Sequence, residues 1–169
     1  MNTRKIILPL ALVLTLGLAS SAFAGASIFG GVNFPTGGFD DAAKTGWTAG
    51  GYYTLDMMPI VDVGVMVDYN DFSYSLAEDT VVEDLFEGSI TAWEFHALGQ
   101  LSFGMLKGYL GLGMATYDMG GDDGSSTDFS WQLGLAAQIA MLEARLGYHQ
   151  IPVDEGSINW MGLTVGLTF

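Results

Sequence analysis

Apolar and polar residues alternate along most of this chain. In residues 159–169, every second position counted back from the carboxyl end is apolar, namely Phe169, Leu167, Val165, Leu163 and Met161. Successive side chains of a β-strand point to opposite faces, so this period of two indicates a strand with one apolar face. Seven earlier stretches show the same pattern. Together they predict eight strands, over residues 26–34, 47–57, 61–70, 91–103, 106–117, 128–140, 142–149 and 159–169.

The connections between the predicted strands alternate in length. Those after the first, third, fifth and seventh strands are the longer ones, whereas those after the second, fourth and sixth are short turns. An even number of antiparallel strands with long loops at one end and short turns at the other is typical of an up-and-down membrane barrel. The stretch 71–90 interrupts the alternation, so we interpret it as a loop. Four of its residues have helical spacing and predict a short amphipathic turn, which either folds back onto the barrel mouth or contacts a partner: Val81, Val82, Leu85 and Phe86.

The residues opposite the apolar faces decide what surrounds the barrel. Many of them are Gly, with Thr, Ser and Gln between, which suits the narrow interior of an eight-stranded barrel. Aromatic residues on the apolar face gather near the predicted strand ends, as in the interfacial girdles of membrane barrels: Phe34, Trp47, Tyr69, Trp93, Phe103, Phe129, Trp131 and Phe169. We therefore expect lipid around the barrel. The alternative is a soluble exported barrel of the lipocalin kind, with the apolar face turned inward.

Residues 1–24 form a separate unit. Two basic residues precede an apolar run over residues 6–18, and the sequence Ala-Phe-Ala ends at Ala24. A charged start, an apolar run of this length and an A-x-A site are typical of a secretory signal peptide, here cleaved after Ala24. The alternative is an uncleaved anchor, but the run is shorter than the ~20 residues that a spanning helix needs. The barrel domain is then expected to comprise residues 25–169.

Composition limits what the predicted mature chain can bind. Without the signal peptide, three Lys or Arg remain against 19 Asp or Glu, a net charge of −16. So acidic a protein is a poor ligand for nucleic acid or for anionic surfaces. The chain has no Cys, so disulfides cannot hold it together after export. No other stretch approaches a spanning helix in length, which leaves a closed barrel as the form it could take in a membrane.

The whole predicted mature chain resembles the small eight-stranded outer-membrane β-barrel proteins, the class of the OmpA membrane domain and OmpX. The resemblance rests on the start of the first strand at 32–37, the Gly-rich strand 109–113, the stretch 142–149 and the terminal Phe169. It implies an all-β, antiparallel up-and-down transmembrane barrel, monomeric, in contact with outer-membrane lipid and lipopolysaccharide. It also implies that the barrel-assembly machinery reads the final strand through Phe169, Leu167 and Val165. The fold alone does not give the function, because this family includes adhesins and structural anchors.

Charged side chains on the inward face form one candidate site. By the alternation, these are Asp56, Asp62, Asp68, Glu94, Lys107, Glu143 and Arg145, with His96 and His149. A buried charge requires an opposite charge beside it, so we favour a polar network in which Arg145 and Lys107 neutralise carboxylates on neighbouring strands. The alternative is a path for protons or ions through the barrel.

Acidic residues in the predicted loops form a second, weaker candidate. Asp122, Asp123 and Asp128 could hold Ca²⁺ or Mg²⁺, alone or bridging to lipopolysaccharide phosphates, because both cations prefer carboxylate oxygens. Their spacing matches no EF-hand loop. We therefore favour a solvated, mutually repulsive surface and predict no metal or cofactor.

The sequence does not favour an enzyme. It has no Cys nucleophile and no H-E-x-x-H, Walker or G-x-S-x-G motif, and the alternation turns both histidines inward. We predict an integral outer-membrane protein with a non-catalytic structural or surface-interaction role and acidic outer loops. A loop-mediated adhesin or small-ligand receptor is the second candidate, and a lipid A-modifying enzyme is the third.

Overall fold

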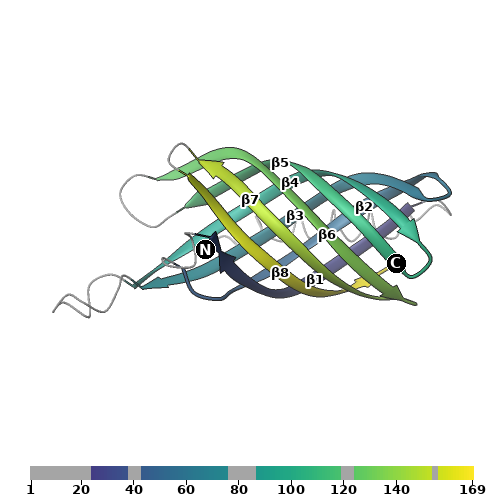
Figure 1. Ribbon diagram of the computed structural model, residues 1–169, viewed down its shortest axis with the longest axis horizontal. Helices are drawn as coiled ribbons and strands as arrows, with labels where there is room; N and C mark the ends of the chain where they lie inside the picture. Colours follow the sequence, from purple (N-terminus) through teal and green to yellow (C-terminus); the bar gives the residue numbers. More distant parts are fainter. Residues whose placement is uncertain (1–23, 38–42, 76–86, 119–123, 154–155) are drawn as a thin grey trace, which may run out of the picture.

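The chain folds into a closed barrel of eight antiparallel strands (Figure 1). The computed structural model describes residues 24–37, 43–75, 87–118, 124–153 and 156–169. The strands are β1 (Ala24–Thr36), β2 (Gly46–Met58), β3 (Val61–Ser75), β4 (Glu87–Phe103), β5 (Leu106–Asp118), β6 (Ser125–Ile139), β7 (Leu142–Val153) and β8 (Gly156–Thr168). Each strand pairs with the next in sequence, which confirms the predicted fold class. The predicted signal peptide lies outside the described residues, except for Ala24 at the start of β1.

The barrel closes where β8 pairs with β1. The ladder runs from Thr36 opposite Asn159 to Ser27 opposite Thr168. It continues one step further, because the Phe169 N–H donates to the Ala26 carbonyl at 2.8 Å and the Ala26 N–H donates back at 3.2 Å. Neither strand is therefore an open edge that could pair with another chain.

The strands reach further at the loop end than the alternation predicts. β3 continues to Ser75 and β4 begins at Glu87, so the prediction of a loop over the whole of 71–90 is wrong at both ends. The inward positions there stay apolar and buried, as Phe72 and Ile90 show. The outward positions become polar, which hides the period of two. The four residues with helical spacing lie in 76–86, outside the described residues.

The ends of β3 and β4 form a two-stranded ribbon. β3 pairs with β2 up to Asp71 opposite Trp47, and β4 pairs with β5 from Thr91 opposite Asp118. Beyond these positions β3 and β4 continue to pair with each other, and the Lys44 N–H donates to the Ser73 carbonyl at 2.7 Å. In Figure 1 this hairpin projects past the other strands.

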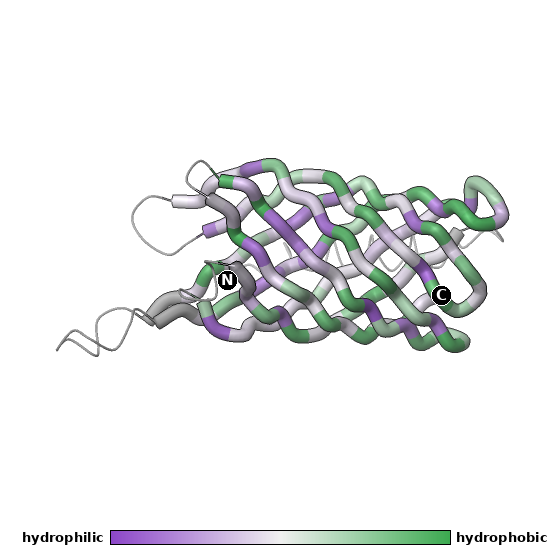
Figure 2. Tube along the Cα trace, in the orientation of Figure 1, coloured by the Kyte–Doolittle hydropathy of each residue, from purple (hydrophilic) through white to green (hydrophobic). Residues whose placement is uncertain are grey.

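The outward face of the barrel is apolar along almost its whole length. Trp93, Phe95, Leu101 and Phe103 on β4 are all exposed, and every other strand repeats the pattern. Figure 2 shows hydrophobic positions alternating with hydrophilic ones around the barrel. A soluble barrel would turn these side chains inward, so the lipocalin-like alternative does not describe this fold. No helix among the described residues is long and apolar enough to cross a membrane.

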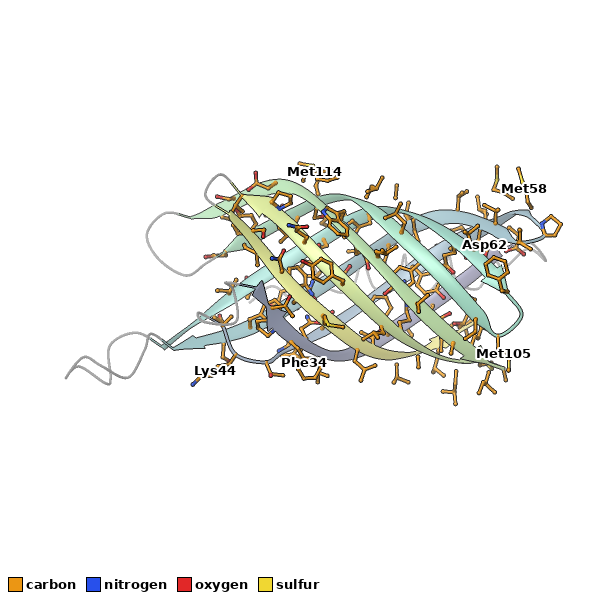
Figure 3. The ribbon with its side chains drawn as sticks, in the orientation of Figure 1. Phe34, Lys44, Met58, Asp62, Met105 and Met114 are labelled. Carbon is orange, nitrogen blue, oxygen red and sulfur yellow. The ribbon has the colours of Figure 1, made fainter. Side chains whose placement is uncertain are left out.

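The short turns extend the apolar surface to one end of the barrel. They expose Met57, Met58, Ile60, Met105 and Met141. In Figure 3, Met58 and Met105 lie at this end, whereas Lys44 lies at the other. One carbonyl of each turn accepts a hydrogen bond from a nearby strand. The backbone N–H groups of residues 102, 138 and 168 donate to the carbonyls of residues 60, 105 and 141, respectively, at 2.8–2.9 Å. The turn end is therefore an apolar rim with little unsatisfied backbone.

Aromatic side chains form a row toward the loop end of the outward face. The rings of Trp47 and Tyr69 lie 5.2 Å apart between centroids, and those of Tyr69 and Trp93 lie 5.0 Å apart. Trp131 and Tyr148 form a similar pair at 5.6 Å. This arrangement matches the girdle expected where a barrel meets a lipid–water interface.

An apolar cluster fills the barrel interior at the loop end. It consists of Ala43, Phe72, Ile90, Ala92, Ala115, Tyr117, Ile151, Ile158 and Trp160. The Phe72 and Trp160 rings pack edge to face with 5.3 Å between centroids. The interior at this end is therefore apolar, whereas the sequence predicts a polar lumen. Four members of the cluster lie on strands of the barrel but beyond the predicted strand ends, so the alternation does not place them inside the barrel: Phe72, Ile90, Ile151 and Ile158.

Candidate functional site: the polar network inside the barrel

Buried polar side chains occupy the middle of the barrel, directly below the apolar cluster. His149 marks the boundary, since its ring stacks on Trp160 with 5.0 Å between centroids and an interplanar angle of 17°. The alternation puts one inward side chain at every second position of each strand, so eight strands bring many such groups into one narrow space. Three groups can be distinguished by their contacts.

The first group joins β3, β4 and β7. Asp68 and Glu94 are opposite each other in the β3–β4 ladder, and His149 Nδ1 lies 2.8 Å from Glu94 Oε2. Asn70 donates to Asp68 Oδ2 at 3.0 Å and to Glu94 Oε2 at 3.4 Å, and it accepts a bond from Asn33 at 2.6 Å. One oxygen of each carboxylate, Asp68 Oδ1 and Glu94 Oε1, is buried without a hydrogen-bond partner.

The second group surrounds His96. Gln132 Nε2 lies 2.9 Å from His96 Nδ1, and Ser130 Oγ lies 2.9 Å from His96 Nε2. The amide nitrogen can only donate, so Nδ1 accepts and the imidazole proton resides on Nε2, where it points to Ser130. Glu94 Oε1 is 3.6 Å from the same Nε2. A serine nucleophile would need that nitrogen free to accept its proton and the acid on the other nitrogen.

The third group surrounds Arg145. Its guanidinium lies 4.0 Å from the Tyr109 ring centroid and 4.8 Å from that of Tyr52, and its Nε is 3.8 Å from Glu143 Oε1. Glu143 also accepts a bond from Lys107 at 3.1 Å, and the Tyr52 hydroxyl lies 2.8 Å from both its oxygens. Two cations and one carboxylate thus share this layer. The carboxylate is on the same strand as Arg145 and two strands away from Lys107, rather than on a neighbouring strand.

Glycines make room for Tyr109 in this third group. A Cβ on Gly134 would collide with the Tyr109 ring and with the Leu146 carbonyl oxygen, and a Cβ on Gly147 would collide with the Tyr109 hydroxyl. The glycines of β6 and β7 therefore leave the space that the Tyr109 ring occupies. Arg145 then stacks on that ring, where the cation is attracted by its π face.

The remaining candidates lie apart from these groups. Asp62 is half-buried near the turn end and accepts a bond from Ser102 Oγ at 3.0 Å. Asp56 is opposite Asp62 in the β2–β3 ladder, on the same face, and is exposed at the open turn end. Asp128 accepts a bond from the Tyr117 hydroxyl at 2.7 Å, while Asp122 and Asp123 lie outside the described residues. The proposed assembly signal is on the outward side of the last strand, where Phe169, Leu167 and Val165 are exposed.

The network also has neutral members, which the candidate site of charged residues and histidines does not include. The alternation that turns the charged residues inward turns these inward too. The buried neutral polar side chains that link the charged ones are Asn33, Tyr52, Asn70, Tyr109, Ser130 and Gln132.

Side chains leave little free space in this part of the barrel. A cavity of about 20 Å³ lies among Met66, Asp68, Gln132, Arg145 and His149, with residues of β1, β2 and β8 on its far wall. That volume holds about one water molecule. Ser130 and Glu94 are fully buried, and His96 is 3% exposed.

Comparison with known proteins identifies the fold. No family model matches the chain, and no curated protein matches it. The crystal structure of Ail, the attachment invasion locus protein of Yersinia pestis, in complex with the heparin analogue sucrose octasulfate, matches with a TM-score of 0.57 and 18% identity, over 87% of this chain and 99% of that chain. The backbone structure of Ail in a phospholipid bilayer nanodisc matches over the same shares, with a TM-score of 0.58 and 14% identity. The outer-membrane protein OprG of Pseudomonas aeruginosa matches with a TM-score of 0.49 and 11% identity, over 87% of this chain and 96% of that chain.

At sequence identities of 11–18%, the likeness to these structures shows a shared fold. The closed ladder, the apolar outward face and the aromatic row agree with it independently of any comparison. The chain has the fold of the eight-stranded outer-membrane β-barrel proteins.

Proposed function

We propose that the mature chain is an integral outer-membrane barrel with a structural or surface-interaction role and no catalytic activity. The observation that carries the proposal is the outward apolar face, which continues over the short turns, around an interior filled by its own side chains. About 9–11 residues suffice for a strand to cross the bilayer core, and β4 has 17. With the apolar turn end at the inner interface, the excess length of β3 and β4 projects outside the cell.

Heat-modifiable gel migration tests this proposal. Outer-membrane and soluble fractions are prepared from cells expressing the full chain, and each is run unheated and boiled in detergent. We expect the protein in the outer-membrane fraction, with the unheated form migrating differently because a closed barrel resists unfolding until it is heated. The same samples give the mature amino terminus, expected at Gly25. Recovery in the soluble periplasm with identical migration would contradict the proposal.

The filled interior supports a barrel that does not conduct ions. The apolar cluster closes the loop end, and the Arg145 layer with Tyr109 and Tyr52 closes the turn end. We expect purified protein in planar bilayers to show no reproducible large conductance steps. Such steps would support the alternative of an ion path.

Binding through the outer loops is the second candidate, and one observation favours it. The ribbon at the ends of β3 and β4 extends beyond the last partners in β2 and β5, and residues 76–86 connect its two strands in the sequence. Ail was solved with a sulfated ligand. Without the predicted signal peptide this chain has a formal net charge of −16, so we propose a neutral or cationic partner instead. Deleting 76–86 should abolish binding to such a partner and leave the heat-modifiable migration unchanged.

During biogenesis and afterwards, the proposed partners are the barrel-assembly machinery, outer-membrane lipid and lipopolysaccharide. The exposed side chains of Phe169, Leu167 and Val165 support recognition by the assembly machinery, because they remain reachable on the outer side of the last strand. Closure of the ladder leaves no strand edge free for a second copy, which supports a monomer.

A further inference from the structure

The charges of the first group inside the barrel do not balance. Asp68 is 1% exposed and Glu94 is fully buried, and they are direct neighbours in the β3–β4 ladder. Both cationic side chains of the interior, Arg145 and Lys107, form ion pairs with Glu143 instead. Buried charges in proteins are paired or coordinate metals. Among the described residues, no Lys or Arg pairs with these two adjacent carboxylates, so they call for a bound cation, a protonated His149 or a shared proton.

Two buried oxygens in this group also lack partners. Asn70 and His149 occupy Asp68 Oδ2 and Glu94 Oε2, whereas Asp68 Oδ1 and Glu94 Oε1 have no hydrogen-bond partner. An unsatisfied buried oxygen costs about 1–3 kcal/mol unless something else binds it. The single-water cavity lies beside these groups, lined in part by Asp68 and His149.

The donor set selects the kind of cation. One atom from each of Asp68, Glu94 and His149 lies within 4.8 Å of the other two. Around a four-coordinate zinc, ligand atoms are about 3.3 Å apart, so modest side-chain rotations would bring these three to the ion. Ca²⁺ requires 6–8 oxygen ligands, and Mg²⁺ retains several waters. A site with one imidazole, two carboxylates and room for about one water suits neither of them.

We propose that the barrel interior binds one divalent transition-metal ion, with Zn²⁺ as the best fit, through Asp68, Glu94 and His149 and a water in the adjoining cavity. The ion supplies the positive charge that the two carboxylates lack and binds their free oxygens. Imidazole must be deprotonated at the nitrogen that binds the metal, so binding releases a proton and tightens as the pH rises. His96 is not a ligand, because Gln132 and Ser130 occupy both of its ring nitrogens.

The test is metal retention by the refolded barrel. The full mature chain is refolded in detergent with Zn²⁺, passed over a chelating resin, and analysed for metal by mass spectrometry. We expect about one zinc per barrel in the parent protein and at least about tenfold less in Asp68→Asn, Glu94→Gln and His149→Gln. Asp62→Asn is the matched control, because it removes the same charge from an inward position of the same strand and should retain the zinc. Heat-modifiable migration verifies that each variant has folded.

Co²⁺ provides a readout that does not depend on the variants. Refolding the parent chain with Co²⁺ should give the intense visible absorption of a four-coordinate ion with nitrogen and oxygen ligands. Absence of both this band and retained zinc would overturn the proposal and leave a proton shared between Asp68 and Glu94. Zinc retained equally by all three ligand variants would also overturn it and assign the metal to the acidic loops.

Discussion

Removing Glu143 tests whether the Arg145 layer is held by charge pairing. Glu143 is the only carboxylate among the described residues in contact with both Arg145 and Lys107. In Glu143→Gln, the amide oxygen can still accept the Tyr52 hydroxyl bond, but both cations lose their counter-charge. The Lys107 side chain is 15% exposed and can turn to water, whereas that of Arg145 is 5% exposed and cannot.

The expected magnitudes follow from these contacts. Removing one member of a buried ion pair leaves the other charge unpaired and lowers the free energy of unfolding by about 3–5 kcal/mol. For Glu143→Gln we expect a loss of about 3 kcal/mol, at the lower end of this range, because the aromatic rings around Arg145 still stabilise its charge. Arg145→Gln loses those ring contacts, about 2 kcal/mol when desolvated, while Glu143 keeps Lys107. The double variant leaves no orphaned buried charge, so we expect about 3 kcal/mol rather than the additive value of about 5.

Equilibrium urea unfolding in lipid vesicles measures these free energies. Tryptophan fluorescence follows the transition, and heat-modifiable migration confirms the folded fraction at each urea concentration. The control is Asp62→Asn, which removes a carboxylate that is paired with no cation and should cost less than about 1 kcal/mol. Additive effects in the double variant would refute the reasoning, because they would show that Glu143 and Arg145 stabilise the barrel independently.

Three further predictions concern the backbone and the last residue. Gly134→Ala should destabilise the barrel by about 1–3 kcal/mol in the same urea assay, because the added methyl group would collide with a backbone carbonyl and the buried Tyr109 ring. The control is Gly99→Ala, whose methyl group would face open space and should change stability by less than about 0.5 kcal/mol. Ala140→Gly should stabilise the barrel by about 0.5 kcal/mol, because φ is 54° at this turn residue and only Gly adopts such a value without strain. An unchanged or lower urea midpoint would contradict this expectation. Deleting Phe169 should slow assembly in cells, measured as the rate at which pulse-labelled protein acquires heat-modifiable migration. Refolding of the same variant in detergent should stay close to normal. Equal loss in both assays would indicate a purely structural role.

The alternation predicts the strands well where the outward face is apolar. Residues 91–103 of β4 and 159–168 of β8 alternate throughout, so this part of each strand can be assigned from sequence. Beyond the apolar band, the outward side chains of Asp71 and Ser73 are polar, and the period of two disappears although β3 continues. The inward Phe72 remained as a signal, but a single apolar residue among polar neighbours does not distinguish a strand from a loop.

The alternation places side chains inside the barrel but does not tell which of them meet. Asp68, Glu94 and His149 belong to three strands, and β7 is not a sheet neighbour of β3 or β4. Their contact depends on how far each strand is shifted along its neighbour, which the barrel's shear determines and local sequence does not. For the same reason the sequence does not show that Arg145 and Lys107 both contact Glu143, which lies two strands away from Lys107.

Pairing of β8 with β1 has a consequence for the order of folding. The Thr168 hydroxyl donates to the Ser27 hydroxyl across 141 residues of sequence, and the ladder between these strands cannot begin until β8 has been synthesised. Bringing two strands so distant in sequence together lowers the entropy of the chain, and this loss comes before the hydrogen bonds between them form. Until β8 pairs, the sheet has one open edge at β1 and another at its last strand. The barrel's topology therefore requires that the incomplete sheet be kept from pairing with other chains.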